Sequence, residues 1–571
     1  MTTTARAAAP AIKPPPGYWQ REASHYPKPL TPLGADFIIE PINRAFRVVF
    51  EEFGFPLEGL EFRDIGGHVY QRLKPLAGGN SSKLPPTWVL WSVVRAHPAF
   101  RKRAARCKEA LTARRDRDFI ARWYDEWRPE LAKEIERLRG VDFAQLSDEQ
   151  LAAHVEELRR FGRDGFLIHF YLTLSWFPII MLSFFGRDHL GFNDESILPF
   201  LSGLSETSSE PSRALAKLAD RIRADDELTS VLTNAQPEAV EAVLTKGNAE
   251  LGASYADYLH RYGCRALRYE LVERSLGERP ELVGQLLQDE LRRPAAVEQE
   301  QRQLAVTREQ ATQKALAALP TDELRKEFSS LLADAQRAYP IREENEFYTV
   351  SVPLALMRFA VLEAGNRLAA GGALATADDV FFHTFDELTA ALRGRAIARE
   401  LIEQRRDALR AAEAFDAPAS YGIEPPIPPL NVFPRETRMA MEMLLYATDK
   451  VFEPEKSNRR ELDGSRVIKG IAAGTGSYTG PARVIMGEDQ FDRLQPGDVL
   501  VCPITSPVWS ILFSKVGALV TDTGGILSHP AIIAREYGIP AVVATGNATQ
   551  IIPDGARVVV NGDSGVVELV S

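Results

Sequence analysis

The sequence predicts a protein of several domains, in which a large, mostly α-helical domain precedes a small α/β domain. Three observations predict this class. The chain has 571 residues, more than one hydrophobic core usually supports. From residue 17 to about 450, apolar residues recur at the three- and four-residue spacing of amphipathic helices. After residue 465 this period gives way to short apolar runs that are separated by Gly, Pro and Asp turns, as in a sheet.

Residues 1–16 form the first predicted unit, a loose N-terminal tail. They are rich in Ala, Pro and Thr and lack the apolar core of a signal peptide. Three cysteines, Cys107, Cys264 and Cys502, stand far apart without paired spacing. This usage is typical of a reducing compartment and indicates neither a disulfide framework nor a zinc site. We therefore expect a cytoplasmic protein without a metal centre.

The charge and hydropathy of the chain limit its partners. A net charge of −10 argues against a surface for nucleic acid. Residues 166–185 form an apolar run that is long enough to span a bilayer. The run contains His169 and Pro178 and lies in mid-chain between charged helices. We favour a buried, aromatic-rich helix with a kink at Pro178 over a membrane span.

The helical domain is predicted to cover residues 17–452. Charged residues occupy one face of each predicted helix and apolar residues the other. The segment 417–434 is rich in proline, so it is predicted to be irregular. The predicted helices are 36–53, 87–109, 148–185, 235–246, 248–261, 296–319, 321–337, 342–368 and 435–452.

A charged segment without apolar periodicity, 453–465, is predicted to be the linker to the second domain. The α/β domain then covers residues 466–571, an ordinary size for a domain. Its predicted strands are 482–485, 499–502, 518–521, 541–544, 557–561 and 566–570.

The most informative stretch of the chain lies within this domain and surrounds His529. An apolar strand ends at Thr521, and Gly524 and Gly525 allow a sharp turn that exposes backbone N–H groups. Ser528 is a favourable N-cap for a helix over 531–537. The sequence therefore predicts that His529 lies at the positive end of a helix.

This position suits a histidine that carries a phosphoryl group. The helix dipole favours the neutral, nucleophilic imidazole, and the same dipole and free N–H groups favour an attached phosphate. Imidazole is also a good leaving group, so the phosphoryl group can move on. The alternative is a polar first residue of an ordinary helix. That alternative suits an isolated Ser-His pair better than a stretch of about twenty residues with one pattern.

The stretch resembles the signature of the phosphohistidine swivelling domain of the phosphoenolpyruvate-utilising and dikinase families. Residues 480–485 and 500–509 resemble other parts of that domain, and the resemblance covers 470–571. Arg535, further along the helix, either pairs with the phosphate or forms a surface salt bridge with Glu536 or Asp522. The residues that the resemblance places along the phosphohistidine loop are Thr521, Thr523, Gly524, Gly525 and Ser528.

The helical part resembles the substrate-binding domain of rifampicin phosphotransferase and of phenol-phosphorylating dikinases such as phenylphosphate synthase. The segments 18–32, 260–271 and 378–388 carry this resemblance. Cys264 stands where the family usually has a histidine, which weakens any role assigned to that position.

The resemblance also concerns the source of phosphate. We find neither a glycine-rich phosphate loop or ATP-grasp-like stretch before the helical part nor a phosphoenolpyruvate-binding barrel after the carrier domain. We therefore expect a substrate-plus-carrier subunit that holds no cofactor tightly. ATP and Mg²⁺ would be bound mainly by a separate ATP-grasp subunit, as the resemblance to the split dikinases implies.

The expected acceptor is a small aromatic alcohol, either a phenol or a 4-hydroxyphenyl ketone such as acetovanillone. Phosphoryl transfer needs positive charge near the phosphate and a base near the acceptor. For each charged candidate an ion pair on a helix surface is the alternative, and for each histidine an ordinary hydrogen bond. The candidates are Arg342, Glu343, Arg265, Glu270, His25, His169, Phe170 and Trp176.

Two other functions stay open at this point. The chain is either a component of a rifampicin-like antibiotic phosphotransferase, or a phosphorelay protein that passes phosphate from His529 to another protein. A deep apolar cavity in the helical domain favours a small-molecule acceptor, whereas a solid bundle favours the relay.

Overall fold

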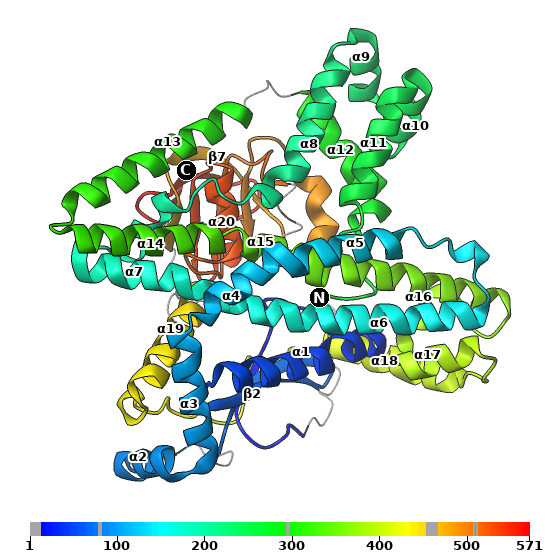
Figure 1. The fold of residues 1–571 in the computed structure, drawn as a ribbon. Coiled ribbons are helices and arrows are strands. Elements are labelled where there is room, and N and C mark those ends of the chain that lie inside the picture. The colour runs from blue at the N-terminus through cyan, green and yellow to red at the C-terminus, as the bar shows by residue number, and fades with distance from the viewer. Residues whose placement is uncertain are drawn as a thin grey trace.

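A large, mostly helical part followed by a small α/β domain makes up the structure, and the predicted fold class is confirmed (Figure 1). The predicted linker, 453–465, lies outside the described residues, as does most of the predicted tail, 1–16. The domain boundaries drawn at these two segments therefore stay predictions. The computed structural model describes residues 13–77, 83–292, 297–452, 466–505, 509 and 512–570.

A bundle of long helices forms the centre of the helical part. Helix α6 packs against α1, α16 and α17. At the start of α1, the Thr31 hydroxyl accepts a hydrogen bond from the Gly34 amide at 3.1 Å, and Pro32 occupies the first helical position. The bounds of these helices are Pro32–Phe53 (α1), Asp148–Tyr171 (α6), Val352–Ala370 (α16) and Phe385–Leu392 (α17).

The predicted helix 148–185 is interrupted before its proline. α6 ends at Tyr171, a 3₁₀ turn covers Leu172–Ser175, and α7 then runs over Trp176–Leu190. Pro178 lies in the first turn of α7 instead of at a kink within one helix. Since proline has no N–H and its ring crowds the carbonyl four residues earlier, the regular helix cannot continue through Leu174.

Two helical stretches have the length and apolar composition to cross a membrane, Asp148–Leu190 and Asp322–Ala370, in a search of the described residues. Within their most apolar windows, 56% and 72% of the residues are buried inside the protein. This burial supports the interpretation of both as core helices.

A small sheet was not anticipated in the helical part. Its strand order is β2-β3-β1-β4, and all three neighbouring pairs are antiparallel. Gly66 and Gly67 join β2 to β3 with φ of 66° and 88°, as a tight hairpin turn requires. The strands are Trp19–Arg21 (β1), Leu57–Ile65 (β2), His68–Pro75 (β3) and Ser420–Tyr421 (β4).

The predicted helix 87–109 is also two helices. Its residue His97 is extended because it precedes a proline, and its ring accepts a hydrogen bond from the Ala99 amide at 3.3 Å. The helices of this region are Thr87–Ala96 (α2), Pro98–Thr112 (α3), Arg115–Arg122 (α4), Arg128–Arg139 (α5), Arg399–Ala414 (α18) and Arg435–Phe452 (α19).

The remaining helices surround the C-terminal domain on two sides (Figure 1). α8 to α12 form an arm on one side, and α7, α13 and α14 lie on the other. Their bounds are Glu206–Arg223 (α8), Asp226–Asn234 (α9), Val240–Gly247 (α10), Ala249–Tyr262 (α11), Pro280–Leu291 (α12), Val297–Ala318 (α13) and Asp322–Ala338 (α14).

One irregular helix joins these helices to the central bundle. The predicted helix 342–368 consists of α15 (Ile341–Glu346), a π-helical turn over Phe347–Ser351, and then α16. π-helical turns are rare and often occur at functional sites. The start of this helix lies at the junction with the C-terminal domain (Figure 1).

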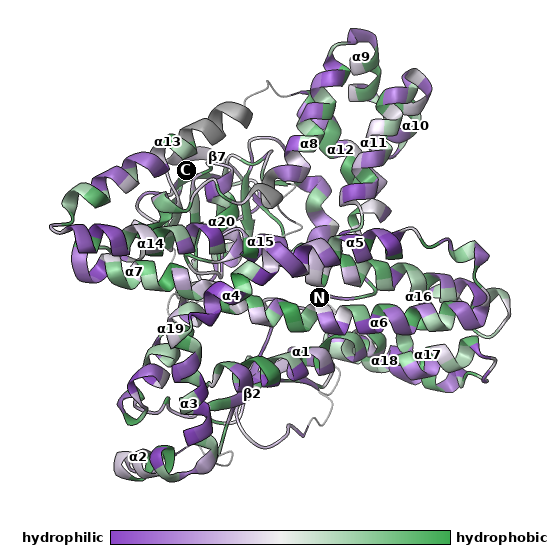
Figure 2. Cartoon of the chain, in the orientation of Figure 1, coloured by the Kyte–Doolittle hydropathy of each residue, from purple (hydrophilic) through white to green (hydrophobic). Residues whose placement is uncertain are grey.

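The C-terminal domain contains an eight-stranded mixed sheet of order β5-β12-β11-β7-β8-β9-β10-β6. The strands β7, β8, β9 and β10 are parallel, and β8, β9 and β10 are buried throughout. The sheet behind α20 contains hydrophobic strands (Figure 2). All six predicted strands are present, but β5, β6 and the first half of β7 were not predicted. The strands are Val467–Lys469 (β5), Ile471–Gly474 (β6), Ser477–Val484 (β7), Val499–Cys502 (β8), Ala518–Thr521 (β9), Ala541–Val543 (β10), Arg557–Asn561 (β11) and Val566–Leu569 (β12).

Candidate phosphoryl-transfer site

The C-terminal domain is docked on the helical part in this structure. Trp509 and Phe513 share a hydrophobic cluster with residues of α8, α11 and α12. Lys515 forms an ion pair with Asp289 of α12 at 3.0 Å, and their side chains are only 1% and 6% exposed. On the opposite side, Ile532 packs with residues of α7 and α14. The domain is therefore fixed from both sides.

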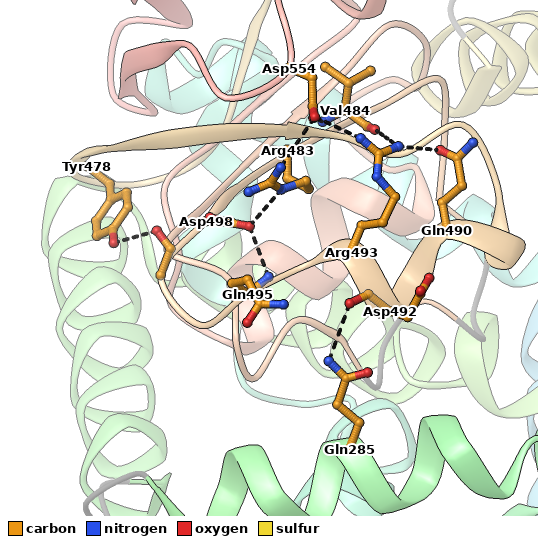
Figure 3. Close-up of polar contacts among 11 residues, drawn as sticks. Gln285, Tyr478, Arg483, Val484, Gln490, Asp492, Arg493, Gln495, Asp498 and Asp554 are labelled. Atoms are coloured by element: carbon orange, nitrogen blue, oxygen red, sulfur yellow. Dashed lines mark hydrogen bonds and ion pairs between the residues drawn. The ribbon is translucent and has the colours of Figure 1, made fainter. Parts of the chain in front are cut away.

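Figure 3 shows the polar network that shapes one edge of the docked domain. Arg483 bonds Asp498 at 3.1 Å and Asp554 at 3.3 Å, and Arg493 bonds Asp554 at 2.7 Å. From α12, the Gln285 side chain donates to the Asp492 carbonyl at 3.5 Å. The arginine bonds brace the loop between β7 and β8 within the domain, and the Gln285 bond joins this loop to the helical arm.

The predicted carrier histidine opens a helix, as the sequence indicated. Helix α20 covers His529–Glu536, and Ser528 is its N-cap residue. The Ser528 hydroxyl, however, donates to the Gly525 carbonyl at 2.6 Å, so it closes the loop instead of accepting from the helix. Gly524 has φ of +110°, and a Cβ there would lie 2.8 Å from the Ser528 hydroxyl oxygen. Glycine is therefore required at this turn.

The threonines of the loop hold its backbone. Thr521 donates to the Thr523 carbonyl at 2.7 Å, and Thr523 donates to the Pro503 carbonyl at 3.1 Å. Both hydroxyls are thus engaged within the loop in this structure. They precede the histidine in the same loop and fix the shape of the turn that presents it.

Arg535 does not form the surface salt bridge that was its alternative role. The side chain is buried and donates to the Ala473 carbonyl at 3.1 Å and to the Ile526 carbonyl at 3.0 Å. A solvated salt bridge at this position is therefore wrong, because α20 turns the arginine into the domain. Arg535 instead ties the carrier loop to β6.

The imidazole of His529 faces the helical part and contacts Glu343 of α15. Its Nδ1 lies 2.7 Å from a Glu343 carboxylate oxygen, and the two side chains are 11% and 6% exposed. The Nε2 atom is buried and has no hydrogen-bond partner among the described residues. The two ring nitrogens therefore differ: one is held by a carboxylate, and the other is left for another group.

Arg342, the neighbour of Glu343, supplies positive charge. Its guanidinium lies 4.5 Å from the centre of the Trp176 ring. Burial lowers the pKa of Arg342 to about 10. Within the described residues, its Nε and Nη1 atoms have no hydrogen-bond partner. A buried guanidinium with unsatisfied donors is suited to bind an anionic group.

Arg265 and Glu270 are also buried. The Arg265 guanidinium lies 4.8 Å from the centre of the Phe347 ring. Glu270 accepts a hydrogen bond from the Thr31 hydroxyl at 2.7 Å, while its second oxygen has no partner in the described part of the chain. Burial raises the pKa of Glu270 to about 7. Neither residue forms the ion pair on a helix surface that was the alternative for each charged candidate.

The two candidate histidines have different surroundings. His25 Nδ1 lies 3.0 Å from the Glu22 carboxylate. His169 Nδ1 lies 3.2 Å from the Thr349 hydroxyl, and burial lowers the pKa of His169 to about 4. Phe170 packs mainly on Phe46, with ring centres 4.2 Å apart. Phe170 is therefore largely a core residue, although it touches the edge of the site through His169.

Sequence reasoning did not single out three other members of this cluster: Glu22, Tyr269 and Glu346. Burial raises the pKa of Glu346 to about 7, and a hydrogen bond from Tyr269 lowers it in part. One signal was present in the sequence. Four consecutive polar residues, 343–346, stand at the start of a long apolar helix, and all four are buried. Buried polar runs of this kind are rare outside functional sites.

No group of three or more His, Cys, Asp or Glu side chains is arranged to hold a metal ion within the described ranges.

Comparison with protein families gives two matches, one in each part of the chain. Residues 494–565 match the PEP-utilising enzyme mobile domain. Residues 176–343 match the rifampicin phosphotransferase fourth domain, a stretch that ends at Glu343. The resemblance of the C-terminal domain to the swivelling domain and that of the helical part to rifampicin phosphotransferase are confirmed, and the chain carries the mobile domain of PEP-utilising enzymes.

Several curated proteins are similar to this chain. The phosphotransferase YvkC of Bacillus subtilis is 30% identical over 424 residues, which are 73% of this chain and 48% of YvkC. A rifampicin phosphotransferase of Streptomyces is 30% identical over 65% of this chain and 41% of its own length. Chondramide synthase of Chondromyces crocatus is 28% identical over 96% of this chain, which corresponds to 14% of that protein. The chain thus spans about half or less of the relatives it matches.

Proposed function

We propose that this protein is a phosphotransferase component in which His529 carries a phosphoryl group to a small hydroxyl compound bound by the helical part. The contact between His529 and Glu343 carries the proposal, because it joins the carrier loop to a buried polar cluster of the other domain. The similarity to phosphotransferases supports the same reaction class.

The two ring nitrogens take different roles in this mechanism. With the proton on Nδ1 facing the Glu343 carboxylate, Nε2 has the lone pair that accepts phosphate. The phosphorylated ring is then cationic, and the carboxylate beside it compensates the charge. When the P–N bond breaks, its electron pair returns to Nε2 and leaves a neutral imidazole.

Arg342 is the proposed ligand of the moving phosphoryl group. Arg342 precedes Glu343 on α15, the helix that His529 contacts, and two of its guanidinium donors have no hydrogen-bond partner among the described residues. Phosphoryl transfer depends mainly on positioning and on positive charge around the equatorial oxygens. A fixed guanidinium held over Trp176 supplies both.

A small phenol, or a 4-hydroxyphenyl ketone such as acetovanillone, is the acceptor that we propose. The support is the resemblance to phenol-phosphorylating dikinases, together with aromatic side chains at the site. Trp176 and Phe347 are only partly buried there, and each ring faces an arginine. By contrast, Trp88 and Trp91 lie on α2, are 72% and 49% exposed, and take no part in the site.

A rifampicin-like antibiotic is the second candidate acceptor. The match of 176–343 to a rifampicin phosphotransferase domain favours it, because this stretch ends at the residue that contacts His529. We propose ATP with Mg²⁺ as the phosphate source for either acceptor, bound mainly by an ATP-grasp partner, as the family resemblance implies.

The transfer step can be tested without that partner. Phosphoramidate phosphorylates imidazole nitrogens directly, so His529 can be loaded chemically and its phosphate located by mass spectrometry. We expect loaded wild-type protein to convert phenol, 4-hydroxyacetophenone or rifampicin into a phosphate ester, and His529→Ala to form none. His154→Gln is the matched control, because His154 also contacts a glutamate but lies on α6, outside the carrier loop.

The outcomes separate the candidate functions. An aryl phosphate establishes the phenol acceptor, and phosphorylated rifampicin establishes the antibiotic. Loaded His529 that phosphorylates none of these compounds, but does phosphorylate a protein, favours the relay. If His529→Ala forms as much ester as wild type, the proposal is wrong. Addition of a candidate ATP-grasp subunit with ATP and Mg²⁺ then tests the phosphate source by release of AMP.

A further inference from the structure

One carboxylate holds His25 by two bonds. The first Glu22 oxygen lies 3.0 Å from His25 Nδ1, and the second accepts the His25 backbone amide at 3.0 Å. The Ser24 hydroxyl also donates to Glu22. Glu22 itself is buried, and its backbone amide bonds the Val69 carbonyl of β3 at 2.9 Å. The small sheet therefore fixes the carboxylate, and the carboxylate fixes the imidazole.

The His25 imidazole remains accessible although its partner is buried. Its side chain is 41% exposed, against 5% for Glu22. The ring lies 5.5 Å from the Tyr269 ring and 6.3 Å from the Tyr26 ring. A buried carboxylate behind an accessible imidazole is the arrangement in which a histidine takes a proton from a bound group.

Helix α15 links this imidazole to the carrier. Glu343 contacts His529, and Glu346, one turn further, interacts electrostatically with His25. Residues three apart on a helix lie on the same face, with Cβ atoms about 5–6 Å apart. His25 and His529 therefore approach neighbouring residues of one short helix from two different domains.

The second histidine is unsuited to the role of base. His169 has the Thr349 hydroxyl as its neighbour and no carboxylate at hydrogen-bond distance in the described contacts. Its ring also makes a T-shaped contact with the ring of Phe170. Burial keeps it neutral, and its pKa of about 4 makes it a poor proton acceptor.

We infer that His25 is the general base that activates the acceptor hydroxyl, and that Glu22 is its positioning residue. The inference rests on the proposed function. The acceptor O–H bond breaks and its proton moves to the imidazole of His25, while the acceptor oxygen forms the new P–O bond. The P–N bond to His529 breaks, and its electron pair returns to Nε2. The product is a phosphate monoester, with His25 protonated until solvent removes the proton.

The test compares two acceptors that differ in their need for a base. Phenol keeps its proton at neutral pH, whereas 4-nitrophenol is largely ionised at slightly alkaline pH. Wild type, His25→Gln, Glu22→Gln and the control His154→Gln are loaded with phosphoramidate and mixed with either acceptor. Loss of a general base slows transfer to phenol by roughly 10²- to 10⁴-fold. Transfer of the same phosphoryl group to 4-nitrophenolate should change less than about tenfold.

A merely structural role for His25 would slow transfer to both acceptors equally, and that result overturns the inference. So does phenol transfer by His25→Gln at the wild-type rate. Circular dichroism and a second variant, His25→Asn, separate misfolding from loss of the base. If wild type itself transfers to neither phenol, the proposed phenol acceptor fails and the inference fails with it. If only the His25 result fails, the proposed function stands.

Discussion

At the scale of single residues, the site is a set of buried charges that are only partly compensated. Glu270 and Glu346 each have a pKa of about 7 because they are buried, and Arg342 has donors without partners in the described structure. Such groups lower the stability of a protein unless a ligand completes their contacts. Their presence at one helix start therefore indicates selection for binding rather than for stability.

Glu270 makes this cost measurable as a function of pH. A carboxyl with a pKa of about 7 in the folded state and about 4.5 in the unfolded state stabilises the fold below pH 4.5, and this contribution is lost as pH rises through 7. We expect Glu270→Gln to equal wild type at pH 4.5 and to be more stable by about 2–3 kcal/mol at pH 8. Urea unfolding at both pH values measures the difference.

The control for this prediction is Glu250→Gln, at an exposed ion pair with Arg221 that should contribute less than about 1 kcal/mol at either pH. Equal stability of wild type and Glu270→Gln at pH 8 would show that Glu270 is ionised without cost.

At the scale of elements, the carrier loop depends on one backbone conformation. Gly524 has φ of +110° and a Cβ there would meet Ser528, whereas Gly538 at the end of α20 has φ of +61° and open space around it. We expect Gly524→Ala to destabilise the domain by about 1–3 kcal/mol and to reduce transfer from His529. Gly538→Ala should cost about 1 kcal/mol and leave transfer intact.

Denaturant unfolding and the phosphoramidate assay measure the two effects separately. Transfer at the wild-type rate by a well-folded Gly524→Ala protein would mean that the loop tolerates a different path to His529.

Elements with local signals were predictable, and those that depend on distant contacts were not. The carrier loop was placed within one or two residues, because Gly524, Ser528 and Pro530 each act on their own neighbourhood. The hairpin at Gly66 and Gly67 had a local signal too, but the surrounding helical pattern obscured it. The break before Pro178 was misplaced because a proline disturbs the turn that precedes it.

Several members of the candidate site were predictable from the sequence, but Glu22, Tyr269, Glu346 and the geometry of the site were not. Arg342 and Glu343 were predicted as candidates because phosphoryl transfer needs positive charge near the phosphate and a base near the acceptor. That Glu343 meets His529 follows only from docking of two parts 186 positions apart in sequence. Likewise, Glu22 is positioned by β1 and β3, which belong to a sheet that the sequence pattern did not reveal. Sequence periodicity contains no information about such pairings.

At the scale of the whole molecule, the docked arrangement depends on a buried ion pair between the two parts. Lys515 and Asp289 are 3.0 Å apart and almost fully buried. Removal of one partner leaves an uncompensated charge and costs about 3–5 kcal/mol, whereas replacement of both by apolar residues is often neutral. We expect Lys515→Met to release the carrier domain and Lys515→Met/Asp289→Leu to restore docking.

Small-angle scattering and the rate of His529 loading by phosphoramidate measure this release. A released domain gives a larger radius of gyration and faster loading, with slower transfer to the acceptor. An unchanged scattering profile for Lys515→Met would show that the hydrophobic contacts alone keep the domain in place.

The burial of His529 against α15 also bears on how long a phosphorylated molecule survives. Phosphohistidine hydrolyses in water, and a ring that is 11% exposed meets few water molecules. Phosphorylated His529 is thus shielded from water while the domain is docked, so its phosphoryl group is hydrolysed slowly before an acceptor binds. Docking therefore sets the lifetime of the phosphorylated protein as well as the position of its histidine. A measured lifetime reports the fraction of phosphorylated molecules in which the carrier domain is docked on the helical part.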